Sequence, residues 1–134
     1  MTNASSRAPL KILIVDDDII TRKLVGAALL GRGYRVTQVD GLTEAGKAIA
    51  TSVYDVSIVD LNMPDGNGME FVHLVRRGLQ SLNPAMTIIV CSAYAAARPA
   101  ALLQRLGADA VFEKPVPLEL LAKLIETEIE NRAA

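Results

Sequence analysis

Acidic, hydroxyl and amine side chains follow four short apolar segments of this 134-residue sequence. They are Asp16, Asp17 and Asp18 after the first segment, Asp60 after the third, Ser92 after the fourth and Lys114 after the fifth. Carboxylates within about 4 to 6 Å of one another repel, which raises their pKa values unless a cation shares the site. A hard divalent cation with oxygen ligands relieves this repulsion, so a group of these acids would suit Mg²⁺.

Together these side chains could carry out phosphoryl transfer. Mg²⁺ is commonly held by one or two carboxylates and phosphate oxygens rather than by a full protein cage. Beside the ion, one carboxylate can attack a phosphoryl group and form an aspartyl phosphate, while Lys114 and the metal neutralise the phosphoryl oxygens. The Ser92 hydroxyl could then hydrogen-bond the product.

The segments that position these residues alternate with longer amphipathic ones. Five short runs rich in Ile and Val are predicted to be strands, at residues 10–15, 34–39, 56–59, 86–91 and 110–112. Five longer segments with apolar residues three and four apart are predicted to be helices, at residues 19–30, 42–51, 69–79, 97–106 and 118–131. Gly31, Gly107 and Pro117 stand at helix boundaries and agree with this assignment.

The predicted strands are apolar at successive positions, as in Ile12-Leu13-Ile14-Val15, so both faces of the sheet must be covered. Alternating strands and helices imply right-handed crossovers and an α/β sandwich. Ligands of such sheets bind at the carboxyl ends of the strands. In the strand order 2-1-3-4-5, strands one, three and four are central neighbours, so the polar residues after them would share one pocket.

Four motifs in this order resemble a known family. They are IVDDD at residues 14–18, VDLNMP at 59–64 with Gly68, CSA at 91–93 and KP at 114–115. Over roughly residues 10–129 the chain resembles the receiver domain of bacterial two-component response regulators. The resemblance implies a flavodoxin-like fold, with a five-stranded parallel sheet in the order 2-1-3-4-5 and five helices in a three-layer α/β/α sandwich.

The resemblance also implies the roles of the acids. Asp60 would be the phosphoacceptor. Asp17, Asp60 and the backbone carbonyl of Asn62 would bind Mg²⁺, with Mn²⁺ as an alternative, and Asp16 would support the metal through water. Such a domain is a phosphoacceptor switch with its own autophosphorylation and autodephosphorylation chemistry, rather than an enzyme.

The same resemblance makes Ser92 the switch hydroxyl and Lys114 the amine that pairs with the phosphate. The family's usual switch aromatic lies three residues before this Lys, where the present chain has Val111. Phe112 comes one residue later and should point to the opposite face of its strand, because strand residues alternate. The family's aromatic rotation therefore cannot operate in its usual form. The two positions that modulate phosphoryl lifetime in the family are Asn62 and Tyr94 here.

Each candidate also has an ordinary structural interpretation. Asp16 to Asp18 could cap the first helix, a role that we expect for Asp18, Asp60 could start a turn, Ser92 could cap a helix, and Lys114 could be a solvated amine. The complete set favours the functional interpretation over these alternatives. His73 is interpreted as a helical residue without a chemical role, and Arg76 and Arg77 as a solvated helix end.

Length and composition favour one domain that folds alone, with residues 1–9 as a flexible leader and 10–131 as the receiver domain. The net charge of -1 offers no basic field for nucleic acid or an anionic membrane, so neither is expected as a partner. The single cysteine, Cys91, cannot form an internal disulfide, and no signal peptide or 18-residue apolar span is apparent. These features favour the cytoplasm.

Three other functions fit the sequence less well. A small-molecule phosphatase with an aspartate nucleophile would need a second Asp two positions after Asp60, where Asn62 stands, and a cap domain. A flavodoxin-like cofactor binder would need a phosphate-binding loop after the first strand. A degenerate receiver used only for docking is disfavoured by the intact acids, although Val111 leaves it open.

We therefore expect the phosphoryl group to come from a sensor histidine kinase or a His-containing phosphotransfer protein. Added charge beside Ser92 and Lys114 should shift the loops after strands three and four. The face built from helix four, strand five and helix five should meet a downstream output domain or effector protein. The exposed side of the last helix is also compatible with a homodimer.

Overall fold

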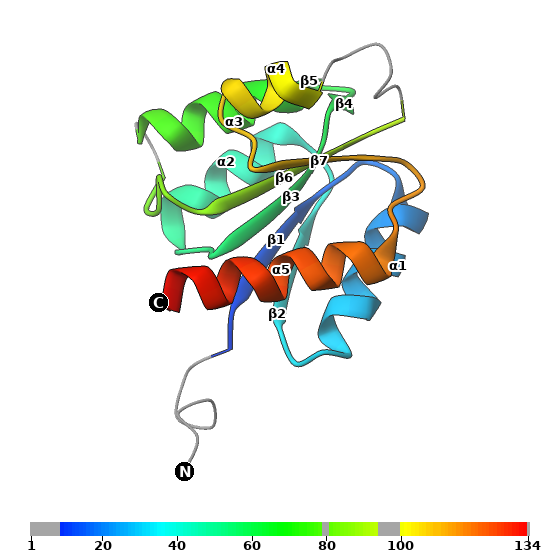
Figure 1. Ribbon diagram of the computed structural model, residues 1–134. Helices are drawn as coiled ribbons and strands as arrows, with labels where there is room; N and C mark the ends of the chain where they lie inside the picture. Colours follow the sequence, from blue (N-terminus) through cyan, green and yellow to red (C-terminus); the bar gives the residue numbers. More distant parts are fainter. Residues whose placement is uncertain (1–8, 79–80, 94–99, 134) are drawn as a thin grey trace.

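A parallel five-stranded sheet lies at the centre of the computed structural model, which describes residues 9–78, 81–93 and 100–133 (Figure 1). Its strands are β1 (Lys11–Val15), β2 (Arg35–Val39), β3 (Val56–Asp60), β6 (Thr87–Ser92) and β7 (Ala110–Glu113). The order across the sheet is β2-β1-β3-β6-β7, and every neighbouring pair is parallel. This is the predicted order 2-1-3-4-5 once the short hairpin β4–β5 is left out of the count.

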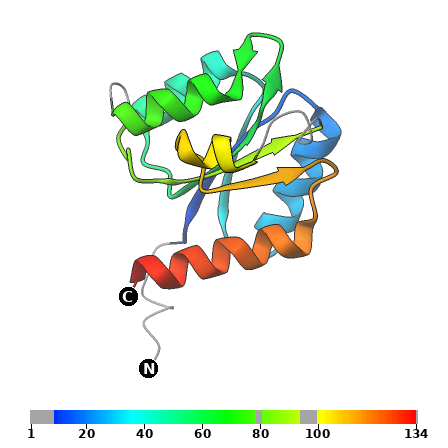
Figure 2. The same cartoon turned by 45° about the horizontal axis from the view of Figure 1, so that its top comes forward.

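Five helices cover the two faces of this sheet, as predicted (Figures 1 and 2). They are α1 (Ile19–Leu30), α2 (Leu42–Thr51), α3 (Gly68–Arg77), α4 (Ala100–Arg105) and α5 (Leu118–Ala133). α1 and α5 lie on one face, whereas α2, α3 and α4 lie on the other. The predicted leader and the predicted start of the fourth helix at residue 97 fall largely outside the described residues.

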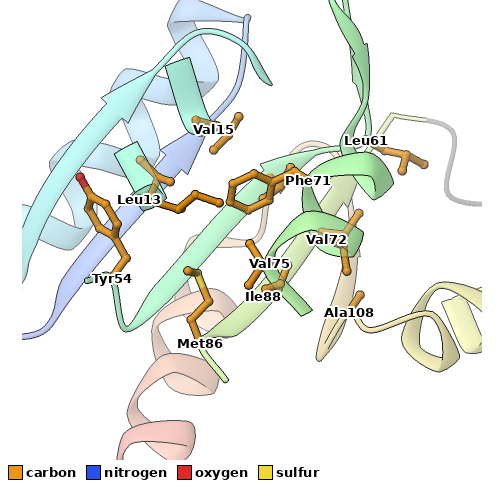
Figure 3. Close-up of a cluster of buried hydrophobic side chains, with 14 of the residues drawn as sticks. Leu13, Val15, Tyr54, Leu61, Phe71, Val72, Val75, Met86, Ile88 and Ala108 are labelled. Carbon is orange, nitrogen blue, oxygen red and sulfur yellow. The ribbon is translucent and has the colours of Figure 1, made fainter. Parts of the chain in front are cut away.

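The two faces bury separate apolar cores. On the α2–α4 face, Phe71, Val72 and Val75 of α3 point toward Leu13 and Ile88 of the sheet (Figure 3). The other core packs α1 and α5 on alternate residues of the same strands, including Ile12, Ile14, Ile58 and Ile89. Because helices cover both faces, β1, β3 and β6 are buried at every position except Lys11, and most of their residues are apolar.

The segment after β3 folds into a short antiparallel hairpin of β4 (Asn62–Met63) and β5 (Gly66–Asn67). The sequence predicted only a run of turn formers here. Gly66 adopts a φ of 147°, a conformation that residues with a Cβ rarely adopt. The hairpin leads directly into α3 and lies at the carboxyl edge of the sheet.

Among the described residues, no helix is both long enough and apolar enough to cross a bilayer.

Candidate metal and phosphoryl site

Three carboxylates meet at the carboxyl edge of the sheet. Asp60 ends β3, and Asp16 and Asp17 follow β1, which pairs with β3 so that Val15 lies opposite Val59. One oxygen from each of the three lies within 4.8 Å of the others. Asp16 and Asp60 are buried, whereas Asp17 is exposed. This donor set fits a hard divalent cation, because carboxylates this close to one another repel unless a positive charge lies among them.

Lys114 supplies positive charge from the neighbouring end of β7. Its Nζ lies 2.9 Å from Asp16 Oδ2 and 3.4 Å from Asp60 Oδ2, and its side chain is only 15% exposed. The Lys114 amide donates to the Ser92 carbonyl at 2.9 Å, and the Lys114–Pro115 peptide bond is cis. Burial lowers the pKa of Lys114. The hydrogen bonds and negative charges of Asp16 and Asp60 raise it by more, so the net effect is a raised pKa.

The site disfavours ionisation of Asp60. Burial raises its pKa from the ordinary 3.8 to about 6, and the charge of Asp16 adds to the effect. Lys114 and the Asn62 amide, which donates to Asp60 Oδ1 at 3.4 Å, act in the opposite direction. One ammonium group therefore does not fully compensate the buried carboxylates, and a bound cation would favour the ionised form.

Ser92 completes the polar end of the sheet. It is the last residue of β6 and is fully buried, and it pairs with Glu113 of β7. Because β6 lies between β3 and β7, Ser92 is placed between the strands that carry Asp60 and Lys114.

The strand β7 shows the expected departure from the family pattern. Val111 packs against the core on the α2–α4 face, whereas Phe112 packs against the core under α1 and α5. The two side chains therefore point to opposite faces, as the strand alternation predicted, and Phe112 does not replace an aromatic at position 111. Tyr94, the other family position noted above, lies outside the described residues.

The loop between β1 and α1 is held by local hydrogen bonds. Asp18 is the N-cap of α1: its side chain accepts from the Ile20 amide at 3.1 Å and from the Thr21 hydroxyl at 2.6 Å, as predicted. Asp16 Oδ1 accepts from the Asp18 amide at 2.9 Å, and Arg22 donates to the Asp16 carbonyl at 2.7 Å. Arg22 was not anticipated, because its partner is a backbone atom.

Gly68 brings the start of α3 against the end of β3. A Cβ at this position would collide with the backbone carbonyl oxygen of Asp60. The Gly68 amide also donates to the Leu61 carbonyl at 2.6 Å. The glycine of the second motif is therefore required by close backbone approach rather than by an unusual φ angle.

Two residues of α3 lie away from this site. His73 is exposed and lies 3.3 Å from Arg77, which agrees with its interpretation as a helical residue. The interpretation of Arg76 as solvated is wrong. Its guanidinium donates to the carbonyls of Pro84, Met86 and Gly107 and forms a 2.8 Å ion pair with Asp109.

Comparisons with known proteins agree with this geometry. The family model of the response regulator receiver domain matches residues 12–126. A cyclic di-GMP phosphodiesterase of Thermotoga maritima is 34% identical over 122 residues, which cover 90% of this chain and 31% of the relative. The chain therefore spans about a third of that protein's length.

Solved structures show the same fold. A CheY-like receiver domain protein of Methanospirillum hungatei superposes with a TM-score of 0.84 at 26% identity, covering 94% of this chain and 98% of its own. The chemotaxis protein CheY4 of Vibrio cholerae superposes with a TM-score of 0.80 at 31% identity, covering 90% and 98%.

Proposed function

Because this chain belongs to the receiver domain family of two-component response regulators, we propose that Asp60 is its phosphoacceptor and that the reaction depends on Mg²⁺. The observation that carries the proposal is the meeting of three carboxylates and Lys114 at the carboxyl edge of the sheet. An ordinary structural role for each residue would not require all four to converge.

Asp17, Asp60 and the backbone carbonyl of Asn62 would hold the cation, with Asp16 contacting it through water; Mn²⁺ would fit the same oxygen ligands. When bound, the ion neutralises charge on the phosphoryl oxygens. Asp17 is the exposed member of the group, so the cation would reach the site from its side.

The transfer itself needs one nucleophile and one fixed cation from the chain. A carboxylate oxygen of Asp60 attacks the phosphorus of a phosphohistidine, the phosphorus–nitrogen bond breaks, and the imidazole leaves with the electron pair. Lys114 moves its ion pairing from the Asp60 carboxylate to the phosphoryl oxygens, and Ser92 hydrogen-bonds the product. Attack of water on phosphorus later releases inorganic phosphate and restores the carboxylate.

The donor would be a sensor histidine kinase or a His-containing phosphotransfer protein in the cytoplasm. The new charge beside Ser92 and Lys114 would change the face formed by α4, β7 and α5, which would meet an output domain, an effector protein or a second copy of the chain. With Val111 and Phe112 on opposite faces of β7, this switch would work without an aromatic at position 111.

Intact mass spectrometry after incubation with acetyl phosphate tests the assignment. The wild type should gain one phosphoryl mass with Mg²⁺ and none with a chelator. Asp60→Asn should gain none, whereas Asp55→Asn, a matched change at the opposite end of β3, should behave as the wild type. A gain that survives Asp60→Asn would place the acceptor elsewhere, and no gain in the wild type would favour a pure docking module.

A further inference from the structure

Asp65 lies in the turn between β4 and β5 and caps a helix to which it does not belong. Its Oδ1 accepts from the Leu42 amide at 3.0 Å, and its Oδ2 accepts from the Thr43 amide at 3.1 Å and the Thr43 hydroxyl at 3.3 Å. The N-cap residue of α2 itself is Gly41, which has no side chain to accept these donors. The first turn of α2 is therefore capped from the hairpin.

The other end of the same hairpin is fixed to α3 by a capping box. Asn67 Oδ1 accepts from the Met69 amide at 2.8 Å, and Glu70 Oε1 accepts from the Asn67 amide at 2.9 Å. The hairpin is thus attached to two helices. Asn62 lies on the first strand of this hairpin, opposite Asn67, and its amide lies 3.4 Å from Asp60 Oδ1.

The glycines around Asp65 leave room for this contact. A Cβ on Gly41 would lie only 3.0 Å from Asp65 Oδ2. A Cβ on Gly66 would lie 2.7 Å from the Leu42 side chain and 2.8 Å from the Glu70 side chain, so both side chains would have to shift to admit it. The backbone amides of Leu42 and Thr43 also lower the pKa of Asp65, so the cap is a carboxylate at neutral pH.

We propose that Asp65 is a positioning residue for the cation site, because its contact with α2 fixes the hairpin that carries the Asn62 carbonyl. The proposal rests on the proposed function, in which that carbonyl is a metal ligand. Asp65 would not touch the ion. It would act indirectly, by holding the Asn62 backbone carbonyl in place as a ligand.

A variant that caps α2 from its own N-cap residue can distinguish two roles of Asp65: positioning of the hairpin and stabilisation of the helix. Asp65→Ala removes both the cap and the attachment. The double variant Asp65→Ala with Gly41→Asp should restore the cap but leave the hairpin detached from α2, while its attachment to α3 remains. Gly41 has φ -169° and ψ 174°, an extended conformation that any residue adopts, and the removed carboxylate frees the space that its new Cβ needs.

Asp65→Ala should lower the Tm by about 3 to 5 °C, the effect of one lost cap in a domain of this size. It should also raise the Mg²⁺ Kd about tenfold, as loss of an outer-shell support typically does. The double variant should regain the Tm but keep the weakened Kd, and its amides at 62–67 should exchange hydrogen faster than those of the wild type. Asp65→Asn, which keeps one acceptor oxygen, should fall between wild type and Asp65→Ala.

Calorimetric titration with Mg²⁺ suits this test because the chain has no Trp. Recovery of the wild-type Kd in the double variant would make Asp65 a helix cap and nothing more, and an unchanged Kd in Asp65→Ala would overturn the proposal directly. Both outcomes leave phosphorylation of Asp60 intact. Absence of Mg²⁺ binding in the wild type would instead overturn the proposed function and the role of Asp65 with it.

Discussion

The charge on Asp60 works against the folded state in the absence of a cation. Its pKa is about 6 in the folded protein and near 3.8 when the chain is unfolded, so the native state binds the proton more tightly. Protonation of Asp60 therefore adds to the free energy of unfolding. This contribution is fully present below about pH 4 and is lost as the pH rises through about 6. Above that pH the cost of the buried charge is constant.

Asp60→Asn should therefore be more stable than the wild type above pH 6 without divalent cations, by on the order of 2 kcal/mol. The difference should vanish below about pH 4, where both side chains are neutral. Urea denaturation between pH 3.5 and 8 with a chelator present measures it. A difference that does not depend on pH would mean that changed packing, and not the charge of Asp60, sets the stability.

Two buried hydroxyls also weaken the fold. Among the described residues, the side-chain oxygens of Ser57 and Thr87 are buried without a hydrogen-bond partner. Ser57→Ala and Thr87→Val should each raise the free energy of unfolding by about 1 kcal/mol. Each change removes a hydroxyl that loses its hydrogen bonds to water on folding and gains none in the protein. Thr51→Val is the matched control, since Thr51 is exposed and its hydroxyl donates to the Lys47 carbonyl. A loss of stability in Thr87→Val would show that its hydroxyl has a partner in solution.

At the scale of elements, Arg76 connects α3 to two loops at the opposite edge of the sheet from the acids. It donates to Pro84 and Met86 before β6, and to Gly107 after α4, while Asp109 accepts both its guanidinium and the Ile88 amide. The segment that follows α4 is thereby fixed to α3.

Arg76→Ala should lower the free energy of unfolding by about 2 kcal/mol, because three backbone carbonyls, two of them in partly buried hydrogen bonds, and Asp109 lose their donor at once. Arg77→Ala, the adjacent exposed arginine, should change it by no more than about 0.5 kcal/mol. Arg76→Lys should recover little, since one ammonium group cannot reproduce the geometry of the guanidinium. Equal losses in Arg76→Ala and Arg77→Ala would contradict the role of Arg76 as a connection between elements.

At the scale of the whole molecule, cation binding and folding should be linked, since the three carboxylates come together only in the native state. Mg²⁺ at about a hundred times its Kd should add about 2.7 kcal/mol to the free energy of unfolding. This gain should fall below about pH 6, where protons compete with the cation for Asp60. Thermal unfolding with and without Mg²⁺ at pH 5 and pH 7.5 measures the linkage. Asp60→Asn should show a much smaller Mg²⁺ effect, and an equal effect in both proteins would locate the cation elsewhere.

Much of this protein was predictable from sequence because the signals are local. Apolar runs predicted the five strands, and spacings of three and four residues predicted the helices. The order of the sheet then placed Asp16, Asp17, Asp60, Ser92 and Lys114 at one edge, since the carboxyl ends of parallel strands coincide. Alternation along a strand likewise predicted that Val111 and Phe112 point apart.

The tertiary structure decided the features that depend on distant partners. The pKa of Asp60 depends on its burial and on the charges of Asp16 and Lys114, which follow two other strands. The role of Arg76 depends on backbone carbonyls that have no sequence signature. The contact of Asp65 with α2 required the hairpin, which the sequence showed only as a run of turn formers. Residue type and periodicity determine which element forms and which face it buries, whereas burial and contacts between segments far apart in the chain arise only when the elements pack.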